Sequence, residues 1–189
     1  MTALQDAQIE FESDGFLPWF LEEPDATLNT VADTETVAHP TDFIRLLDDG
    51  KLQRFDSTAA VTAQWTPLTF GDLDELRATY QSSTGVPTAY HLEPTVFRLF
   101  PTPDDVYVIK VPYYKKDATL SSGSVENLWL THAHEYLIGR AGRYIAEDLR
   151  DDKAKDKFSN MELRGQSRLI RRHYDFENAT GQLQMGGPH

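Results

Sequence analysis

Apolar residues recur at the three- to four-residue spacing of an amphipathic helix in three stretches of the chain. They predict helices over about residues 2–13, 125–150 and 153–172. The middle helix carries a continuous apolar stripe, formed by Leu130, Ala133, Leu137, Ala141, Tyr144 or Ile145, and Leu149. The last helix has an apolar side as well, with Phe158, Met161 and Leu169.

Two further features concern the ends of these helices and their packing. Residues 174–189 hold too few core-forming side chains to fold alone, so they predict an extended C-terminal tail. Gly139, Ala141 and Gly142 are small residues inside the middle helix. A glycine costs a helix about 1 kcal/mol relative to alanine, so two glycines in four residues indicate close packing against another backbone.

Between the first and second helices the pattern changes to the alternation typical of β-strands. The clearest strands are 95–100 and 106–114, joined by the turn Pro101-Thr-Pro-Asp-Asp105. Alternation places Phe97 and Leu99 on one face of the first strand. Pro112 cannot donate a ladder hydrogen bond, which predicts an edge position or a bulge in the second strand.

Two more local signals complete the β-rich region, which is expected over about residues 27–116. The sequence Asp48-Asp-Gly50 between apolar runs predicts a β-hairpin. Residues 69–80 have helical spacing, with Asp72, Asp74 and Glu75 near the start, where the helix dipole favours anions.

The order of these elements predicts an α+β fold. The N- and C-terminal helices form a helical bundle, and a small antiparallel β-sheet region is inserted between them. A chain of 189 residues suits one domain, here residues 1–173, followed by the C-terminal tail.

A dense apolar segment, Phe16-Leu-Pro-Trp-Phe-Leu21, follows the first helix. Exposed aromatic residues mark interfaces, so one interpretation is an anchor for a partner. The other is a core segment at the passage from helix to sheet, which we favour because large apolar residues are more often buried.

The net charge of −12 argues against a general nucleic-acid binder, whose affinity comes from neutralising phosphates. Its distribution is uneven. Residues 1–110 hold 19 acidic and 6 basic side chains, whereas residues 139–173 hold 6 acidic and 10 basic ones. Such asymmetry indicates either an electrostatic surface for a partner or solvated helix faces. No apolar run approaches the ~18 residues of a membrane helix, and the start lacks the features of a signal peptide.

The candidate chemistry is sparse, and we expect no enzyme activity, cofactor or metal. His132, His134 and Glu135 form the only cluster that resembles a metal site. On a helix, residues two apart point in nearly opposite directions, so the two histidines cannot ligate one ion together. The aspartate pairs at 48/49, 104/105 and 151/152 lie in predicted turns or helix ends, where aspartate is structurally favoured.

The last predicted helix carries a basic stripe at three- to four-residue spacing, formed by Arg164, Arg168, Arg171 and Arg172. The stripe can line a channel for DNA, pair with acidic groups of a partner or of a neighbouring subunit, or simply be solvated. Tyr174 and Phe176 follow it and add apolar anchors, a combination favoured at protein interfaces. Because the rest of the chain is acidic, we favour protein docking.

Residues 85–130 also resemble a known family. Gly85-x-Pro-x-x-Tyr90 is followed by a strand ending in Phe100-Pro-x-Pro-Asp104 and by the pair Tyr113-Tyr114. Leu120-Ser121 and Asn127-x-Trp-Leu130 then precede a helix. This order resembles the head-to-tail adaptor proteins of tailed bacteriophages. The segment His39-Pro-Thr-Asp-Phe43 is similar to the family's Leu-Pro-x-Asp-Phe, with histidine in place of the apolar residue.

The resemblance implies a structural protein of the virion neck, made in the host cytoplasm. It implies a ring, commonly of twelve copies, that binds the portal and joins the DNA-filled capsid to the phage tail or to a further connector. DNA passes through such a ring without sequence-specific binding, and no membrane is involved. Adaptor C-termini often reach into the portal, which corresponds here to residues from about Arg164 onward.

A second hypothesis belongs to a different functional class. The chain can be a cellular module whose small β region binds a peptide or glycan through aromatic residues, namely Trp65, Tyr90, Tyr113 and Tyr114.

Overall fold

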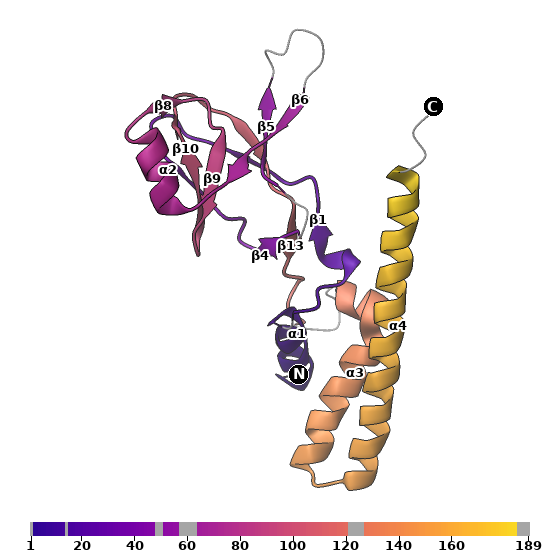
Figure 1. Cartoon of the computed structure of the whole chain (residues 1–189). Helices are drawn as coiled ribbons and strands as arrows, with labels where there is room; N and C mark the ends of the chain where they lie inside the picture. Colours follow the sequence, from indigo (N-terminus) through magenta and orange to yellow (C-terminus); the bar gives the residue numbers. More distant parts are fainter. Residues whose placement is uncertain (1, 14, 48–50, 57–63, 121–126, 185–189) are drawn as a thin grey trace. The chain divides into compact units, whose positions relative to one another are not determined.

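The computed structural model describes residues 2–13, 15–47, 51–56, 64–120 and 127–184 (Figure 1). The chain forms two compact units, of which unit 1 comprises Met1–Leu21 and Lys116–His189 and unit 2 comprises Glu22–Lys115. Unit 1 is helical and unit 2 contains short strands, so the predicted α+β fold with an inserted β region is confirmed. Within the described residues, no helix is long and apolar enough to span a membrane.

Unit 1 contains the helix α1 (Thr2–Ser13), the 3₁₀ turn η1 (Trp19–Leu21) and two long helices, α3 (Leu128–Asp148) and α4 (Asp152–Gln184). The start of α3 is capped twice, because the side chain of Asn127 accepts from Leu130 N at 3.1 Å and the Asp117 carboxylate accepts from Leu128 N at 2.6 Å. Helical dihedral angles are interrupted once within α3, at Ala133 (φ −135°, ψ 26°).

Helix α4 continues well beyond the predicted end at residue 172. It runs to Gln184, so the extended conformation predicted for residues 174–184 is wrong, and residues 185–189 lie outside the described part. The prediction missed a packing contact: the ring of Phe176 stacks on Trp19 of η1, with centroids 6.1 Å apart. This contact adds apolar burial that residues 174–184 lack on their own.

Helices α3 and α4 pack closely, as the glycines predicted. A Cβ atom added at Gly139 would lie 2.5 Å from Glu162 N, and one at Gly165 would lie 2.5 Å from Tyr136 N. At Gly142 it would meet the ring of Phe158 at 2.4 Å. At Gly139 and Gly165 the contacted atoms belong to the backbone and cannot rotate away, so only glycine allows the helices to approach this far at these two positions.

Helix α1 and η1 pack against α3 through aromatic rings. Phe11 is buried and stacks on Tyr136 with centroids 3.9 Å apart, and it also contacts Trp129 at 5.4 Å. In the following apolar segment Phe20 and Leu21 are buried, as the core interpretation predicted. Phe16, at the start of that segment, is 36% exposed.

The described part of unit 2 contains the helix α2 (Leu73–Tyr80) and short strands in four sheets. The sheet orders are β1-β13-β4, β3-β10-β9-β7, β11-β8 and β2-β12-β5-β6, with β7–β9 and β8–β11 parallel and the other pairs antiparallel. The strands are β1 (Glu22–Glu23), β2 (Thr27–Asn29), β3 (Thr36–Ala38), β4 (Phe43–Leu46), β5 (Gln53–Asp56), β6 (Gln64–Pro67), β7 (Thr69–Phe70), β8 (Thr84–Gly85), β9 (Ala89–Leu92), β10 (Val96–Phe100), β11 (Thr102–Pro103), β12 (Val108–Lys110) and β13 (Tyr113–Lys115).

The core of unit 2 lies on both faces of β10. Phe97 and Leu99 are fully buried on one face, as the alternation predicted, in a cluster that includes Leu52, Leu68, Tyr90, Ile109, Val111 and Tyr113. Phe100 points to the other face and packs with Leu76 of α2 and Ala89 of β9.

The predicted strands 95–100 and 106–114 do not pair with each other. Strand β10 pairs with β3 and β9, whereas residues 106–114 form two strands, β12 and β13, that belong to different sheets. The break falls at Pro112, which lacks a backbone donor. The Asp48–Gly50 turn lies outside the described residues, but its flanking strands β4 and β5 also belong to different sheets. Pairing between distant segments therefore overrides the local turn signals.

Candidate interaction surface

Charged side chains on one side of the α3–α4 pair are matched with partners. Glu162 of α4 accepts from Arg140 Nε and, at 2.9 Å, from Arg143 Nε. Glu147 lies 3.3 Å from Arg143 and 3.2 Å from Lys155. These ion pairs join the two helices on this side, so its charges are engaged within the unit.

Helix α1 adds to the same network. Tyr144 donates to the carboxylate of Glu10, and Arg140 forms an ion pair with Glu10 and lies 4.8 Å over the ring of Phe11. The hydrogen bond from Tyr144 lowers the pKa of Glu10 despite partial desolvation, and Arg140 lowers this pKa further. Burial alone would lower the pKa of Arg140, but hydrogen bonds with Tyr144 and the carboxylates raise it. Both groups are therefore charged and hold α1 against α3.

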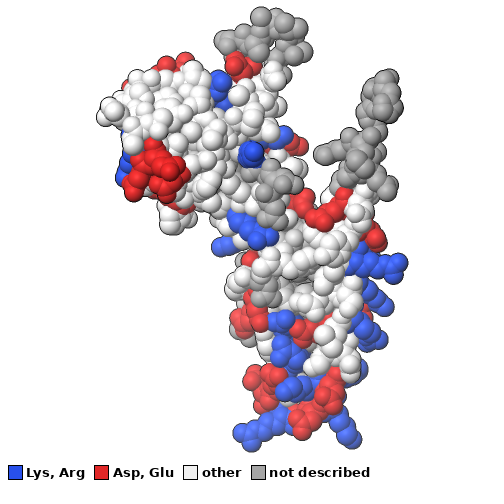
Figure 2. Space-filling model, viewed as in Figure 1, with Lys and Arg blue, Asp and Glu red and all other residues white. Residues whose placement is uncertain are grey.

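The opposite side of the pair carries a row of basic side chains along α4, visible as blue side chains beside the helix in Figure 2. The row consists of residues spaced by seven, four and three positions, which places them on one flank of a helix: Lys157, Arg164, Arg168 and Arg171. A shallow groove follows this flank and is lined by Lys157, Asn160, Leu163, Arg164, Ser167 and Arg168. We call Lys157, Arg164, Arg168 and Arg171 the basic row.

The predicted stripe residues differ in their contacts. Arg164 is exposed and donates only to the backbone oxygen of Asn160, at 3.3 Å, among the described residues. Arg168 forms an ion pair with Glu135 of α3, although its side chain is 70% exposed. Arg171 is 85% exposed and lies 4.0 Å from Asp175.

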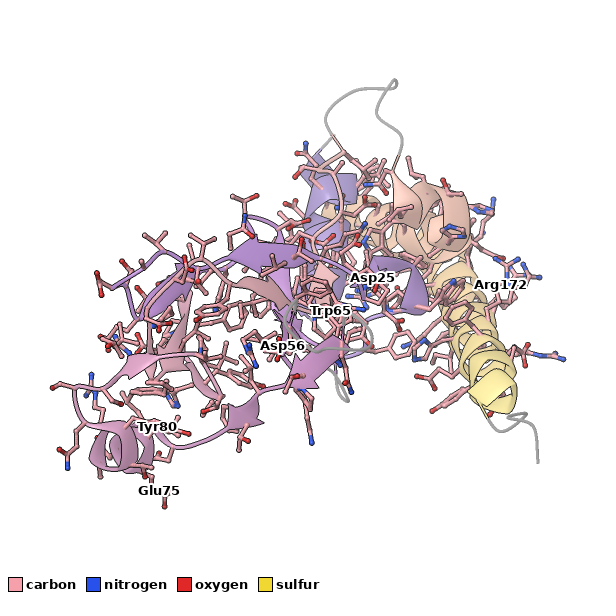
Figure 3. The ribbon with its side chains drawn as sticks, turned by 90° about the horizontal axis from the view of Figure 1, so that it is seen from above. Asp25, Asp56, Trp65, Glu75, Tyr80 and Arg172 are labelled. Atoms are coloured by element: carbon pink, nitrogen blue, oxygen red, sulfur yellow. The ribbon has the colours of Figure 1, made fainter. Side chains whose placement is uncertain are left out.

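Arg172, which is labelled in Figure 3, departs from this flank. It donates to the backbone oxygen of His132 on α3 at 3.4 Å. Tyr174 and Phe176, which follow the stripe, lie on different sides of α4. In a helix, residues two apart point in nearly opposite directions. Phe176 turns to Trp19, while Tyr174 is 58% exposed.

The predicted apolar stripe of α3 is only partly buried. Ala133, Leu137 and Ala141 are buried as predicted, whereas Ile145 and Leu149 are 51% and 73% exposed. The error comes from the four-residue spacing, since each such step turns ~40° past a full helical turn. Leu130 is also exposed, at the first turn of α3 before the interruption at Ala133.

Ile138, which the predicted stripe did not include, is exposed at 39%. Seven-residue spacing places Ile138 and Ile145 on the same face of α3, and Leu149 follows one turn later. We call these three residues the apolar ridge.

A small cavity connects the ridge side of α3 with the basic row. It has a volume of about 60 Å³ and is lined by His132, Ala133, His134, Glu135, Tyr136, Gly165, Arg168, Leu169 and Arg172. Arg168 borders both this cavity and the groove along α4, and Ile138 follows His134 by one helical turn. The apolar ridge and the basic row therefore share one face of the α3–α4 pair, which we call the open face.

The histidines of this region are arranged by packing. The ring of His132 stacks on Phe20, with centroids 5.1 Å apart, and lies 5.9 Å from Trp19. His134 is exposed. Among the described residues, no three histidine, aspartate or glutamate side chains converge as metal ligands do.

The aromatic residues named for a peptide or glycan site in unit 2 are mostly in the core. Tyr90, Tyr113 and Tyr114 are each less than 7% exposed. Trp65 of β6 packs on Phe55 of the neighbouring strand, with ring centroids 5.2 Å apart (Figure 3). These rings stabilise the sheets, and Tyr90, Tyr113 and Tyr114 are not presented on the surface.

Comparison with known protein families gives one result that covers nearly the whole chain. A family model described as SU10 adaptor protein matches residues 1–184, which include both units. A search of curated proteins found no match. The resemblance recognised in the sequence, which is most specific in residues 85–130, is thereby confirmed over residues 1–184.

Proposed function

The chain belongs to the SU10 adaptor family of phage head-to-tail adaptors, and from this premise we propose that it forms a ring beneath the portal and joins the capsid to the phage tail. The observation that carries the proposal is the family match over residues 1–184. The family is structural, which supports a role in assembly without catalysis. Copies of this chain would belong to the neck of the virion, between the portal on one side and the tail or a further connector on the other.

The length of α4 supports a contact between its C-terminal end and the portal. Helix α4 has 33 residues and α3 has 21, and the two run antiparallel with Arg172 beside His132. This register brings Leu128, the first residue of α3, level with about residue 176. Residues 177–184 then extend past the start of α3 by ~12 Å. A helical end that projects from its own unit is suited to insertion into a partner.

The ring is proposed to contain twelve copies, which is the common number in such adaptors. DNA would pass through its centre without sequence-specific contacts. The net charge of −12 supports this role, because an acidic chain has no general attraction for phosphates.

The test is assembly with the portal protein of the same phage. We expect the chain to bind the portal as a ring, visible by electron microscopy and by a mass increase equal to a fixed number of copies. A variant truncated after residue 176 should keep its helical circular dichroism and lose portal binding at least tenfold, since it lacks the projecting helical end. The matched control is Lys116→Glu, an exposed site outside α3 and α4.

Two results would contradict the proposal at different points. A full-length chain that is monomeric with and without portal would overturn the ring. A truncated variant that binds the portal as tightly as the full chain would leave the ring intact and refute the role of residues 177–184.

A further inference from the structure

We propose that the open face of α3 and α4 binds unit 2 of a second copy of this chain, at a patch formed by Val31, Asp33, Asp104, Asp105 and Val106. The inference rests on the proposed ring and adds which two surfaces meet at each contact between neighbouring copies. The family match carries no information about these surfaces.

The open face has the composition of a protein interface. Ile138, Ile145 and Leu149 of the apolar ridge are 39%, 51% and 73% exposed. Beside them, Lys157 and Arg164 have no carboxylate partner among residues 2–13, 15–47, 51–56, 64–120 and 127–184. Exposed apolar side chains next to unpaired charges gain free energy when a partner covers the first and neutralises the second.

The patch on unit 2 is built by two loops that are joined through their backbones. Asp33 N donates to the oxygen of Pro103 at 2.8 Å, and Thr30 N donates to the oxygen of Tyr107 at 2.9 Å. These bonds place Val31 and Val106 in neighbouring loops. The two valines are 62% and 60% exposed, more than most valines of a folded protein. We call the five residues named above the acidic patch.

The carboxylates of the acidic patch are free to meet cations. Asp33, Asp104 and Asp105 are exposed, and no lysine or arginine of the described residues forms an ion pair with them. Asp104 accepts a hydrogen bond from the hydroxyl of Tyr107 at 2.6 Å, which raises the pKa of Tyr107 to about 12. The tyrosine therefore stays protonated at neutral pH and donates to Asp104.

The two surfaces are complementary in kind. Each combines apolar side chains with unpaired charges of one sign, and the signs are opposite. The wider regions follow the same rule: residues 153–172 hold 7 basic and 2 acidic side chains, whereas residues 22–115 hold 15 acidic and 7 basic ones. Opposite potentials of this type select the partner and its orientation.

Charge also decides against two other occupants of the open face. Two copies meeting through the same face would bring their basic rows together, and like charges across an interface are strongly unfavourable. Different surfaces of successive copies must therefore meet, which is the contact that closes a ring. DNA phosphates would pair with the basic row, but they would leave the apolar ridge exposed to water.

The test exchanges the charges of the two surfaces. The face variant carries Lys157→Glu with Arg164→Glu, two residues without a carboxylate partner among the described ones. The patch variant carries Asp33→Lys with Asp104→Lys and keeps Asp105, whose side chain accepts from Val106 N at 2.7 Å. The control is Lys51→Glu with Lys116→Glu, which changes the net charge by the same amount and in the same direction as the face variant, at exposed sites outside both surfaces.

Assembly is measured in the presence of the portal, as mass by light scattering and as rings by electron microscopy. We expect the face variant and the patch variant, each alone, to assemble at least tenfold more weakly than the control. Mixed in equal amounts, they should assemble again, because each reversed face then meets a reversed patch in an alternating ring. If the open face met the acidic patch of the same chain, mixing would restore nothing, because each chain would still hold two surfaces of like charge. If the patch variant does not fold, as judged by its thermal unfolding, Asp33→Asn with Asp104→Asn replaces it. This variant keeps the wild-type open face and should assemble more weakly than the control, because its patch has lost two negative charges.

The outcomes separate this inference from the proposed function. Rings of normal stability from the face variant would overturn the inference and leave the ring itself intact. Weakening of both variants without restoration in the mixture would also overturn it, in favour of a contact within one chain. Loss of DNA retention by the face variant with unchanged rings would point to DNA as the occupant and refute the inference. A wild-type chain that never assembles on the portal would overturn both proposals together.

Discussion

Alanine at Gly139 or Gly165 should destabilise unit 1, although alanine is the better helix former. Both glycines lie where the backbones of α3 and α4 meet. An added Cβ atom would lie 2.5 Å and 2.7 Å from Glu162 N and Cα in the first case, and 2.5 Å from Tyr136 N in the second. Since a comfortable carbon contact needs about 3.5 Å, the helices would have to move apart by about 1 Å.

The magnitude follows from two opposing effects. Replacing a helical glycine by alanine gains about 1 kcal/mol of helix propensity. Forcing an extra carbon into a packed contact costs about 1–3 kcal/mol, here toward the upper end, because backbone atoms cannot rotate away. Separation also lengthens the ion pairs of Glu162 with Arg140 and Arg143, which cross the same contact. We expect a net loss of about 1–2 kcal/mol for either variant.

The assay is urea unfolding followed by circular dichroism at 222 nm, at one protein concentration. Gly142→Ala should cost less, because its Cβ meets the ring of Phe158, which can shift. Gly15→Ala is the matched control, because nothing lies within 4 Å of its added Cβ. If Gly139→Ala and Gly165→Ala instead stabilised the protein by about 1 kcal/mol, as at an exposed helical site, the close approach of the helices would be refuted.

Three further predictions concern single side chains. Burial lowers the pKa of His39 in the folded state below its ordinary value of 6.5. As the pH falls below 6.5, the unfolded state therefore binds the proton more readily, and the free energy of unfolding decreases. His39→Leu should therefore reduce the dependence of the unfolding free energy on pH between about pH 5 and 7, and an unchanged slope would contradict this. Asp117→Ala removes the acceptor of Leu128 N at the start of α3 and should lower the free energy of unfolding by about 1–2 kcal/mol in the same urea assay. An unchanged free energy of unfolding would show that water replaces the carboxylate as the acceptor. Phe176→Ala removes the ring that stacks on η1 and should lower helix content and amide protection in residues 174–184; unchanged hydrogen exchange there would refute the contact.

Local periodicity predicted the features that depend on neighbours in the sequence. The bounds of α1 and the burial of Phe97 and Leu99 agree with it, because a strand alternates and a helix repeats regardless of the rest of the fold. The close packing at Gly139 was also predictable, since a glycine inside a helix is costly unless something packs against it.

The features that sequence reasoning missed depend on distant segments. The end of α4 could not be placed without knowing that Trp19 lies beside Phe176, 157 positions later in the chain. The partners of β12 and β13 are likewise set by pairing across the unit and not by the turns beside them. The exposure of Ile145 and Leu149 could be suspected from the sequence, because residues at strict four-residue spacing drift around a helix. Where the covered face of α3 ends is set by the positions of α1 and α4, which the sequence does not give.

The basic side chains of α3 and α4 separate into two groups with different physical roles. Arg140 and Arg143 have carboxylate partners within unit 1, whereas Lys157 and Arg164 have none among the described residues. A net charge computed over residues 139–173 adds the two groups together, yet only unpaired charges can attract a partner without breaking contacts within the unit. Arg140→Glu and Arg164→Glu change the net charge equally. The first should therefore lower the unfolding free energy, while the second should leave folding intact and weaken assembly, and equal effects on both measurements would show that the two groups are not distinct.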